Sequence, residues 1–157
     1  FGGFISVHVL GIFEPVMDLH PELFFFTPLI AAMAGNVGVQ SSAIIVQGLA
    51  NNTIIGPVVE RLLKELSLSL LNGVILSVIL LAGSYFLLGY EIHVGYTVSI
   101  ALLSVIIMAS LIGTFIPIIL NKYGVDPALA TGPFITTSND ILGILTYFTI
   151  AKIILGI

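Results

Sequence analysis

Long apolar stretches alternate with short polar breaks along the chain, and this pattern predicts its secondary structure. The five stretches cover residues 1–13, 23–50, 66–90, 94–120 and 127–157. A helix rises about 1.5 Å per residue, so each of the last four can cross a hydrocarbon core about 30 Å thick. We interpret all five as helices, because an open sheet edge would leave backbone groups unpaired in lipid. The pattern therefore predicts an all-α polytopic membrane protein with five transmembrane helices.

The first stretch is the shortest, because it stops at Glu14-Pro15 after only about 20 Å of helix. The chain begins inside an apolar run, so we expect this first helix to be truncated at its N-terminus. A signal peptide is not indicated, since no basic segment precedes the run and no small-residue cleavage site follows it. Residues 1–157 are expected to form one transmembrane domain with no soluble regulatory domain.

Composition supports a membrane setting and excludes several functions. Hydrophobic residues make up 58% of the chain and charged residues 8%, whereas a soluble domain carries about 25% charged residues. Four Lys and Arg residues leave no basic patch for nucleic acid, and the absence of Cys excludes disulfides and thiolate zinc sites. No catalytic triad, paired-carboxylate, zinc-protease or phosphate-loop motif is present. The sequence does not indicate an enzyme.

The few basic residues predict the orientation in the membrane. Arg61 and Lys64 lie between the second and third stretches, and Lys122 lies between the fourth and fifth. The other two breaks contain acidic residues but no Lys or Arg, and only Lys152 argues for the opposite orientation. Basic loops stay in the cytoplasm. We therefore expect an integral protein of the cell (plasma) membrane with a cytoplasmic N-terminus and an external C-terminus.

Asp140 lies about 13 residues into the fifth stretch, which places it about 20 Å from the cytoplasmic end and near the membrane centre. A carboxylate at that depth costs a few kcal/mol, and such residues usually have a function. The alternatives are a protonated Asp140 or one paired with Lys152 through a flexible stem. A pair within one helix is excluded, because twelve residues separate the two.

The neighbours of Asp140 are rich in oxygen. Thr136 and Thr137 lie on the same helical face, and Gly143 follows three residues after the acid. Gly132-Pro133 is expected to disturb the helix and free backbone carbonyls. Carboxylate, hydroxyl and carbonyl oxygens suit a hard cation. The alternative is that these Gly, Pro and Thr residues only pack helices closely.

The second stretch carries an amide stripe on one helix face, at spacings of four, three, four and four: Asn36, Gln40, Ala43, Gln47 and Asn51. The second apolar stretch is interrupted by residues 34–38, where Gly35 and Gly38 indicate a close backbone approach or a departure from helix. The stripe fits either hydrogen bonds between helices or the lining of a pore. The charged segment 60–65 is interpreted as a solvated interfacial face, and His8, His20 and His93 as structural residues.

Two motifs resemble the MgtE family of magnesium channels. One is Pro28-Leu29-Ile30 followed by Gly35-Asn36-Val37-Gly38-Val39-Gln40-Ser41-Ser42-Ala43. The other begins at Gly124-Val125-Asp126-Pro127-Ala128-Leu129-Ala130 and continues through Pro133, Thr136-Thr137 and Asp140 to Gly143. Shorter matches at residues 11–14 and 60–65 extend the resemblance over nearly the whole chain.

The resemblance implies a five-helix domain that forms a homodimer with the pore between its subunits. It also implies that Asp140 binds Mg²⁺ in the pore, with Asn36 nearby. Relatives usually carry amino-terminal cytoplasmic domains, including a CBS pair, that sense magnesium. This chain departs from some relatives at three positions. Those relatives have a polar residue in place of Val39, a basic residue in place of Gln47 and Asn in place of Gly132.

Transport of Mg²⁺ or a related divalent cation is the function that these observations predict. We expect Asp140 and Thr136 to hold the transported ion through its waters. The predicted pore-lining residues are Asn36, Gly35, Gln40, Thr137, Gly132, Pro133 and Gly143. The alternatives are a proton- or sodium-coupled secondary transporter of another substrate and a membrane subunit that transports nothing.

Overall fold

The computed structural model describes residues 2–54 and 56–157, apart from the side chain of Ala130, and contains no strand in these ranges. The helices are α1 (Gly2–Ile12), α2 (Glu14–Leu19), α3 (Glu22–Ala50), α4 (Val58–Phe86), α5 (Ile92–Lys122) and α6 (Pro133–Leu155), with a short 3₁₀ helix η1 (Pro127–Ala130) before α6. Four of them, α3 to α6, are long and apolar enough to cross a membrane, and α1 is a shorter apolar helix. The predicted all-α membrane class is confirmed.

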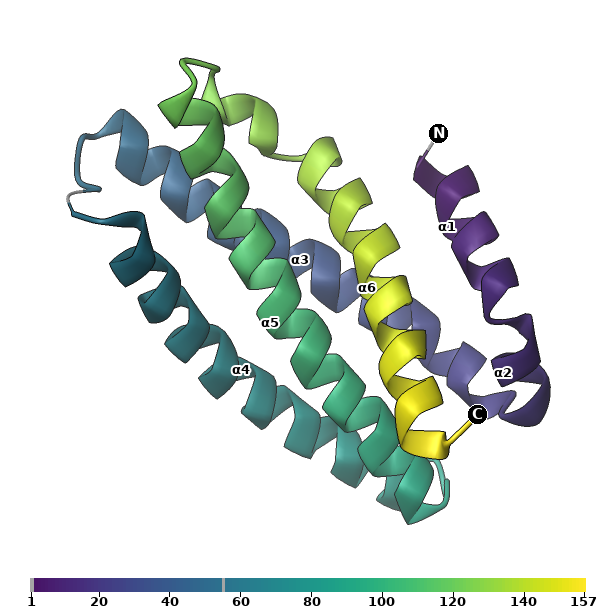
Figure 1. The fold of residues 1–157 in the computed structure, drawn as a ribbon. Coiled ribbons are helices and arrows are strands. Elements are labelled where there is room, and N and C mark those ends of the chain that lie inside the picture. Colours follow the sequence, from purple (N-terminus) through teal and green to yellow (C-terminus); the bar gives the residue numbers. More distant parts are fainter. Residues whose placement is uncertain (1, 55) are drawn as a thin grey trace.

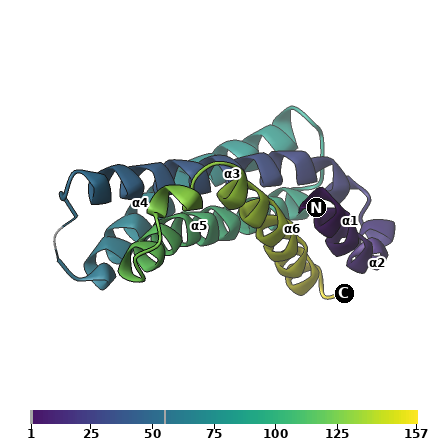
Figure 2. The ribbon, with the colours of Figure 1, turned by 90° about the horizontal axis from the view of Figure 1, so that it is seen from above.

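Helix α5 lies at the centre of the bundle. It packs against α3, α4 and α6, while α3 also packs against α6 and α1 lies along α6 (Figure 1). Seen from above, α3, α4 and α5 form an elongated group from which α6 diverges (Figure 2). The inner face of α5 consists of small and branched residues, and Ala101, Val105 and Ala109 have no exposed surface. Such residues allow the helices of a membrane bundle to approach closely.

Aromatic side chains hold the C-terminal half of α6 in place. The Tyr147 hydroxyl donates a hydrogen bond of 2.9 Å to the carbonyl oxygen of Leu23, at the start of α3. The next residue, Phe148, stacks on Phe13 with ring centroids 5.3 Å apart. Both α6 residues are fully buried. These contacts hold α6 against α3 and against the corner between α1 and α2.

Two details of the predicted helices are wrong. The second stretch is not interrupted at residues 34–38, because α3 runs unbroken from Glu22 to Ala50. At Glu14-Pro15 the chain does not leave helix for a loop, because α2 begins there after a turn at Phe13. Pro is well tolerated in the first turn of a helix, where its missing N–H has no partner to lose.

Candidate functional site

Asp140 packs directly on the backbone of α3. A Cβ built on Gly35 would lie 3.2 Å from Oδ1 of Asp140 and 3.3 Å from Cγ2 of Thr136. Thr136 and Asp140 are four residues apart and therefore share one face of α6. The predicted close approach at Gly35 is confirmed. Asp140 remains partly exposed at the surface of this chain, so its carboxylate is within reach of water or of another subunit.

The start of α6 differs from the prediction. Gly132 precedes the helix with φ 64°, and Pro133 is the first helical residue. Asp140 is thus seven residues, or about 10 Å, from the beginning of α6, and not about 20 Å inside a longer helix. The Gly132 carbonyl is not free either, since the amide and the hydroxyl of Thr136 both donate to it at 3.0 Å.

The other predicted residues of α6 point to different neighbours. Thr137 faces α1, because a Cβ on Gly2 would collide with its methyl group. Gly143 is buried, and a Cβ there would lie 2.9 Å from that of Ala34 in α3. Pro133 is exposed at the start of the helix. The structure therefore brings Thr136, Asp140 and Gly35 together, while the pore-lining role of Thr137, Gly132, Pro133 and Gly143 stays a prediction.

The amide stripe of α3 faces outward from this chain. Its four amide residues, Asn36, Gln40, Gln47 and Asn51, are exposed, and Ala43 is half-exposed. Asn36 follows Gly35 directly, so the stripe runs beside the Asp140 contact. Exposed amides on a membrane-spanning helix need water or another protein surface, since lipid offers no hydrogen bonds. This favours a pore or an interface over hydrogen bonds within the chain.

Asn139 is a site residue that sequence reasoning missed. It is fully buried, and neither polar atom of its amide has a hydrogen-bond partner in the described part of the chain. It packs on Gly38, where a Cβ would collide with its Nδ2, and a Cβ on Gly113 of α5 would collide with the Gly38 carbonyl. An unpaired buried amide costs about 1–3 kcal/mol. Its position next to Asp140 was the signal available in the sequence.

Glu65 is the second missed residue, and its interpretation as part of a solvated face is wrong. Its Oε1 accepts hydrogen bonds from the hydroxyls of Ser41 at 2.6 Å and Ser110 at 2.9 Å. These contacts join α3, α4 and α5. The rest of the charged segment fits the prediction better, because Glu60 and Lys64 are exposed.

No group of three or more His, Asp or Glu side chains that could hold a metal ion lies within the described residues 2–54 and 56–157. Asp140 in α6 and Glu65 in α4 therefore belong to no such cluster within these residues. Two His–Glu pairs lie near the ends of helices, with His20 Nδ1 2.9 Å from Glu22 Oε1 and His93 Nδ1 3.3 Å from Glu91 Oε2. Any cation at Asp140 would keep most of its own water unless a second chain contributed oxygen.

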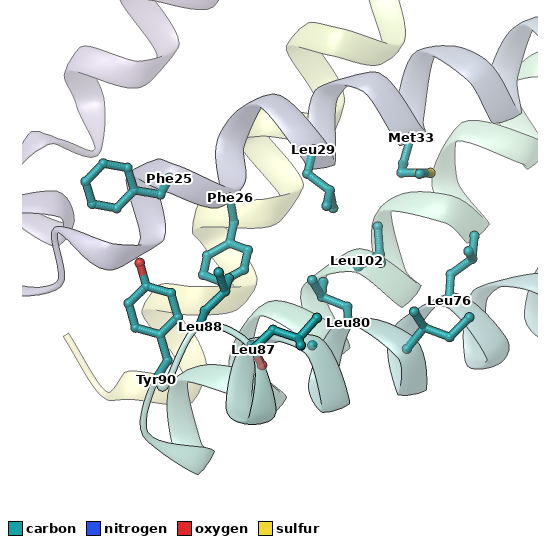
Figure 3. Close-up of a pocket in the computed structure, with 13 residues that line it drawn as sticks. Phe25, Phe26, Leu29, Met33, Leu76, Leu80, Leu87, Leu88, Tyr90 and Leu102 are labelled. Atoms are coloured by element: carbon teal, nitrogen blue, oxygen red, sulfur yellow. The ribbon is translucent and has the colours of Figure 1, made fainter.

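A large apolar groove lies apart from these acids. It has a volume of about 620 Å³ and lies between α3, α4 and α5, where Phe25, Phe26, Leu80 and Leu87 line it (Figure 3). Its surface is almost entirely carbon, so it offers few oxygen atoms to an ion. The groove is therefore not part of the candidate cation site.

Comparisons with known proteins identify the family of the chain. A family model described as MgtE, divalent cation transporter, matches residues 27–150. The chain is 39% identical over 152 residues to the magnesium transporter MgtE of Bacillus subtilis, covering 96% of this chain and 34% of that protein. It is 32% identical over 154 residues to the protein of the same name from Thermus thermophilus, covering 98% and 34%, and 34% identical over 155 residues to that from Enterococcus faecalis, covering 97% and 34%.

The chain spans about a third of the length of these curated relatives. The family model covers most of the chain, including Gly35, Thr136 and Asp140. It describes a transporter, in agreement with the prediction that the chain is not an enzyme. The chain belongs to the MgtE family of divalent cation transporters.

Proposed function

We propose that this chain forms the membrane pathway through which Mg²⁺ or a related divalent cation crosses the bilayer. The observation that carries the proposal is the Asp140 carboxylate, which lies inside an apolar helix against the bare backbone of Gly35 and remains partly exposed. An ionisable residue within a membrane-spanning helix usually marks an ion path. The three magnesium transporters that resemble the chain support the choice of ion.

The pathway is proposed to lie between two copies of the chain. Asp140 and the amide stripe are both accessible at the surface of a single copy. A twofold axis beside α3 and α6 would bring two Asp140 carboxylates together and place both stripes against water instead of lipid. A closed dimer with one shared interface is also the commonest symmetric assembly.

Mg²⁺ is proposed to pass as a hydrated ion. It dehydrates reluctantly and demands an octahedral shell, and one carboxylate per chain supplies too few ligands to replace its waters. Two Asp140 side chains would bind the ion through its water shell and favour divalent over monovalent charge. The Thr136 hydroxyl already donates to the Gly132 carbonyl at 3.0 Å, so its oxygen can accept a hydrogen bond from such a water.

The orientation and location are proposals of the same kind. The start of α4 carries Arg61 and Lys64 and the end of α5 carries Lys122, which favours a cytoplasmic position for this end of the bundle. The opposite end of the bundle carries the acidic residues Glu14, Asp18, Glu22 and Glu91. These acids would raise the local concentration of cations at an external mouth in the plasma membrane.

Flux of Mg²⁺ into liposomes that contain the purified protein tests the function. Asp140→Asn keeps the size of the side chain and removes its charge, so we expect it to insert normally and to lose at least 90% of the flux, roughly the tenfold loss that about 1.4 kcal/mol would cause. Glu60→Gln is the matched control, because it removes one exposed negative charge from the start of α4. Wild-type flux in a stably inserted Asp140→Asn protein would refute the proposal.

A coupled transporter is the second candidate, and the Glu65 carboxylate is the observation that favours it. A second acid between helices could carry a coupling ion. Uptake of Mg²⁺ that moves protons or sodium in a fixed ratio would support this candidate. Cation current that is independent of both gradients would favour a simple channel.

A further inference from the structure

A small polar cavity lies on the opposite side of α3 from Asp140. It has a volume of about 110 Å³ and lies between α3, α4 and α5. The polar residues in its wall are Gln40, Ser41, Glu65, Ser69, Asn72 and Ser110. Along α3, Ser41 is six residues, or about 9 Å, nearer than Gly35 to the end from which α4 departs. The cavity is therefore separate from the Asp140 contact and lies closer to the basic loop.

The carboxylate of Glu65 is held in place inside this cavity. One of its oxygens accepts both serine hydroxyls, and Ser41 and Ser110 are 4% and 0% exposed. These two hydrogen bonds fix the position of the carboxylate between α3, α4 and α5.

This charge has no basic partner. In the ranges 2–54 and 56–157, no Lys or Arg lies within ion-pair distance of Glu65. The nearest basic residues along the chain, Arg61 and Lys64, line a different cavity beside the loop between α3 and α4. A lone carboxylate between membrane helices costs several kcal/mol unless another charge or water compensates it. The cavity beside Glu65 provides space for such a partner.

Charge and ligand chemistry identify the partner. Every polar group that lines the cavity offers oxygen, from a carboxylate, hydroxyls and the amides of Gln40 and Asn72, and oxygen ligands suit hard cations. A single carboxylate balances one positive charge. A monovalent cation that exchanges part of its water shell for these oxygens would therefore neutralise the site.

We propose that Glu65, Ser41, Ser110 and the amides of Gln40 and Asn72 form a binding site for a hard monovalent cation such as Na⁺. Binding there is independent of the proposed function, since the site lies apart from Asp140. Any effect of the ion on Mg²⁺ flux rests on that function. The link would be α3, because Gln40 belongs both to the rim of this cavity and to the outward amide stripe.

Thermal unfolding of the purified protein in detergent tests the site, with NaCl replaced stepwise by choline chloride at constant ionic strength. An ion that binds only the folded state raises the midpoint temperature of unfolding until the site is saturated. We expect this rise with Na⁺ and not with choline. Glu65→Gln should abolish it, whereas Asp140→Asn should retain it. A loss of Mg²⁺ flux in Asp140→Asn with the Na⁺ response intact would separate this site from the proposed function.

Glu65→Gln could also weaken the packing of α3, α4 and α5, so a second variant is needed. Asn72→Leu changes only the rim and breaks neither serine hydrogen bond to Glu65. We expect it to require about tenfold more Na⁺ for the same rise in midpoint, while Glu60→Gln leaves the response unchanged. An unchanged Na⁺ response in both Glu65→Gln and Asn72→Leu, an equal response to choline, or a Glu65-dependent response to Mg²⁺ that exceeds that to Na⁺ would each overturn the proposal.

Discussion

At Gly35 the backbone of α3 forms one wall of the site around Asp140. In Gly35→Ala the new Cβ would lie 3.2 Å from Oδ1 of Asp140 and 3.3 Å from Cγ2 of Thr136. Both distances are shorter than ordinary van der Waals contact, so the carboxylate must shift by a few tenths of an ångström. We expect Mg²⁺ flux into liposomes to fall several-fold with little loss of folded protein, because Ala favours helix over Gly by about 1 kcal/mol.

Gly83→Ala is the control for this change. Gly83 lies inside α4, another membrane-spanning helix, and a Cβ there meets no atom of the described residues within 4 Å. It gains the same helix propensity without touching the acid. Equal flux in the two variants would show that the contact at Gly35 does not set the position of Asp140.

Single residues also mark the limit of what the sequence could predict. Asp140 could be found from the sequence, because a carboxylate inside an apolar stretch is energetically unfavourable and therefore rare. Glu65 could not, since it belongs to a charged run that looks like an ordinary solvated helix start. Its hydrogen bonds come from Ser41 and Ser110, which lie 24 and 45 residues away. Only the packing of α3 and α5 against α4 brings these hydroxyls to the carboxylate.

At the scale of elements, the start of α6 depends on the backbone of Gly132. Its φ of 64° and ψ of −131° belong to a backbone region that residues other than glycine rarely adopt. A Cβ there would meet nothing within 4 Å of the described residues, so Gly132→Ala would act through backbone strain alone. We expect this variant to lower the free energy of unfolding by about 1–3 kcal/mol, measured by thermal or denaturant unfolding in detergent.

Pro133→Ala at the same junction provides the comparison. Proline in the first helical position mainly restricts the unfolded chain, so its loss should cost about 1 kcal/mol or less. A Gly132→Ala protein as stable as Pro133→Ala would mean that the turn before α6 relaxes without strain. The hydrogen bonds from Thr136 to the Gly132 carbonyl would then also tolerate a change in the turn.

Helices were predicted well in kind and less well in extent. The length of the apolar stretches identified the long spans, since an open sheet edge could not be satisfied in lipid and helix could. The disturbance at Gly132-Pro133 was expected, but the stretch before it was predicted to be helix, whereas it forms η1 and a turn and α6 begins only at Pro133. The expected interruption of α3 was wrong because Gly35 and Gly38 serve close packing, which leaves the helix intact.

At the scale of the whole molecule, the amide stripe predicts where a second copy must lie. The chain contains no Cys, so one introduced thiol reports on one position. Ala43→Cys lies within the outward stripe of α3, and Val78→Cys lies on the outer face of α4, where Val78 is 61% exposed. We expect a charged, water-soluble thiol reagent to modify Ala43→Cys in membranes and to leave Val78→Cys largely unmodified, because only the first would face water.

The same two variants test the dimer. A direct disulfide needs Cα atoms within about 7 Å, which is too close for two walls separated by a hydrated ion, so a short bifunctional thiol cross-linker is the better probe. We expect Ala43→Cys to give a product of twice the chain mass and Val78→Cys to stay monomeric. If Val78→Cys cross-linked instead, or if both thiols reacted alike with the charged reagent, the stripe would not line a shared path. Asp140 would then need its water from within a single chain, where one half-buried carboxylate beside Gly35 is a poor match for a divalent ion.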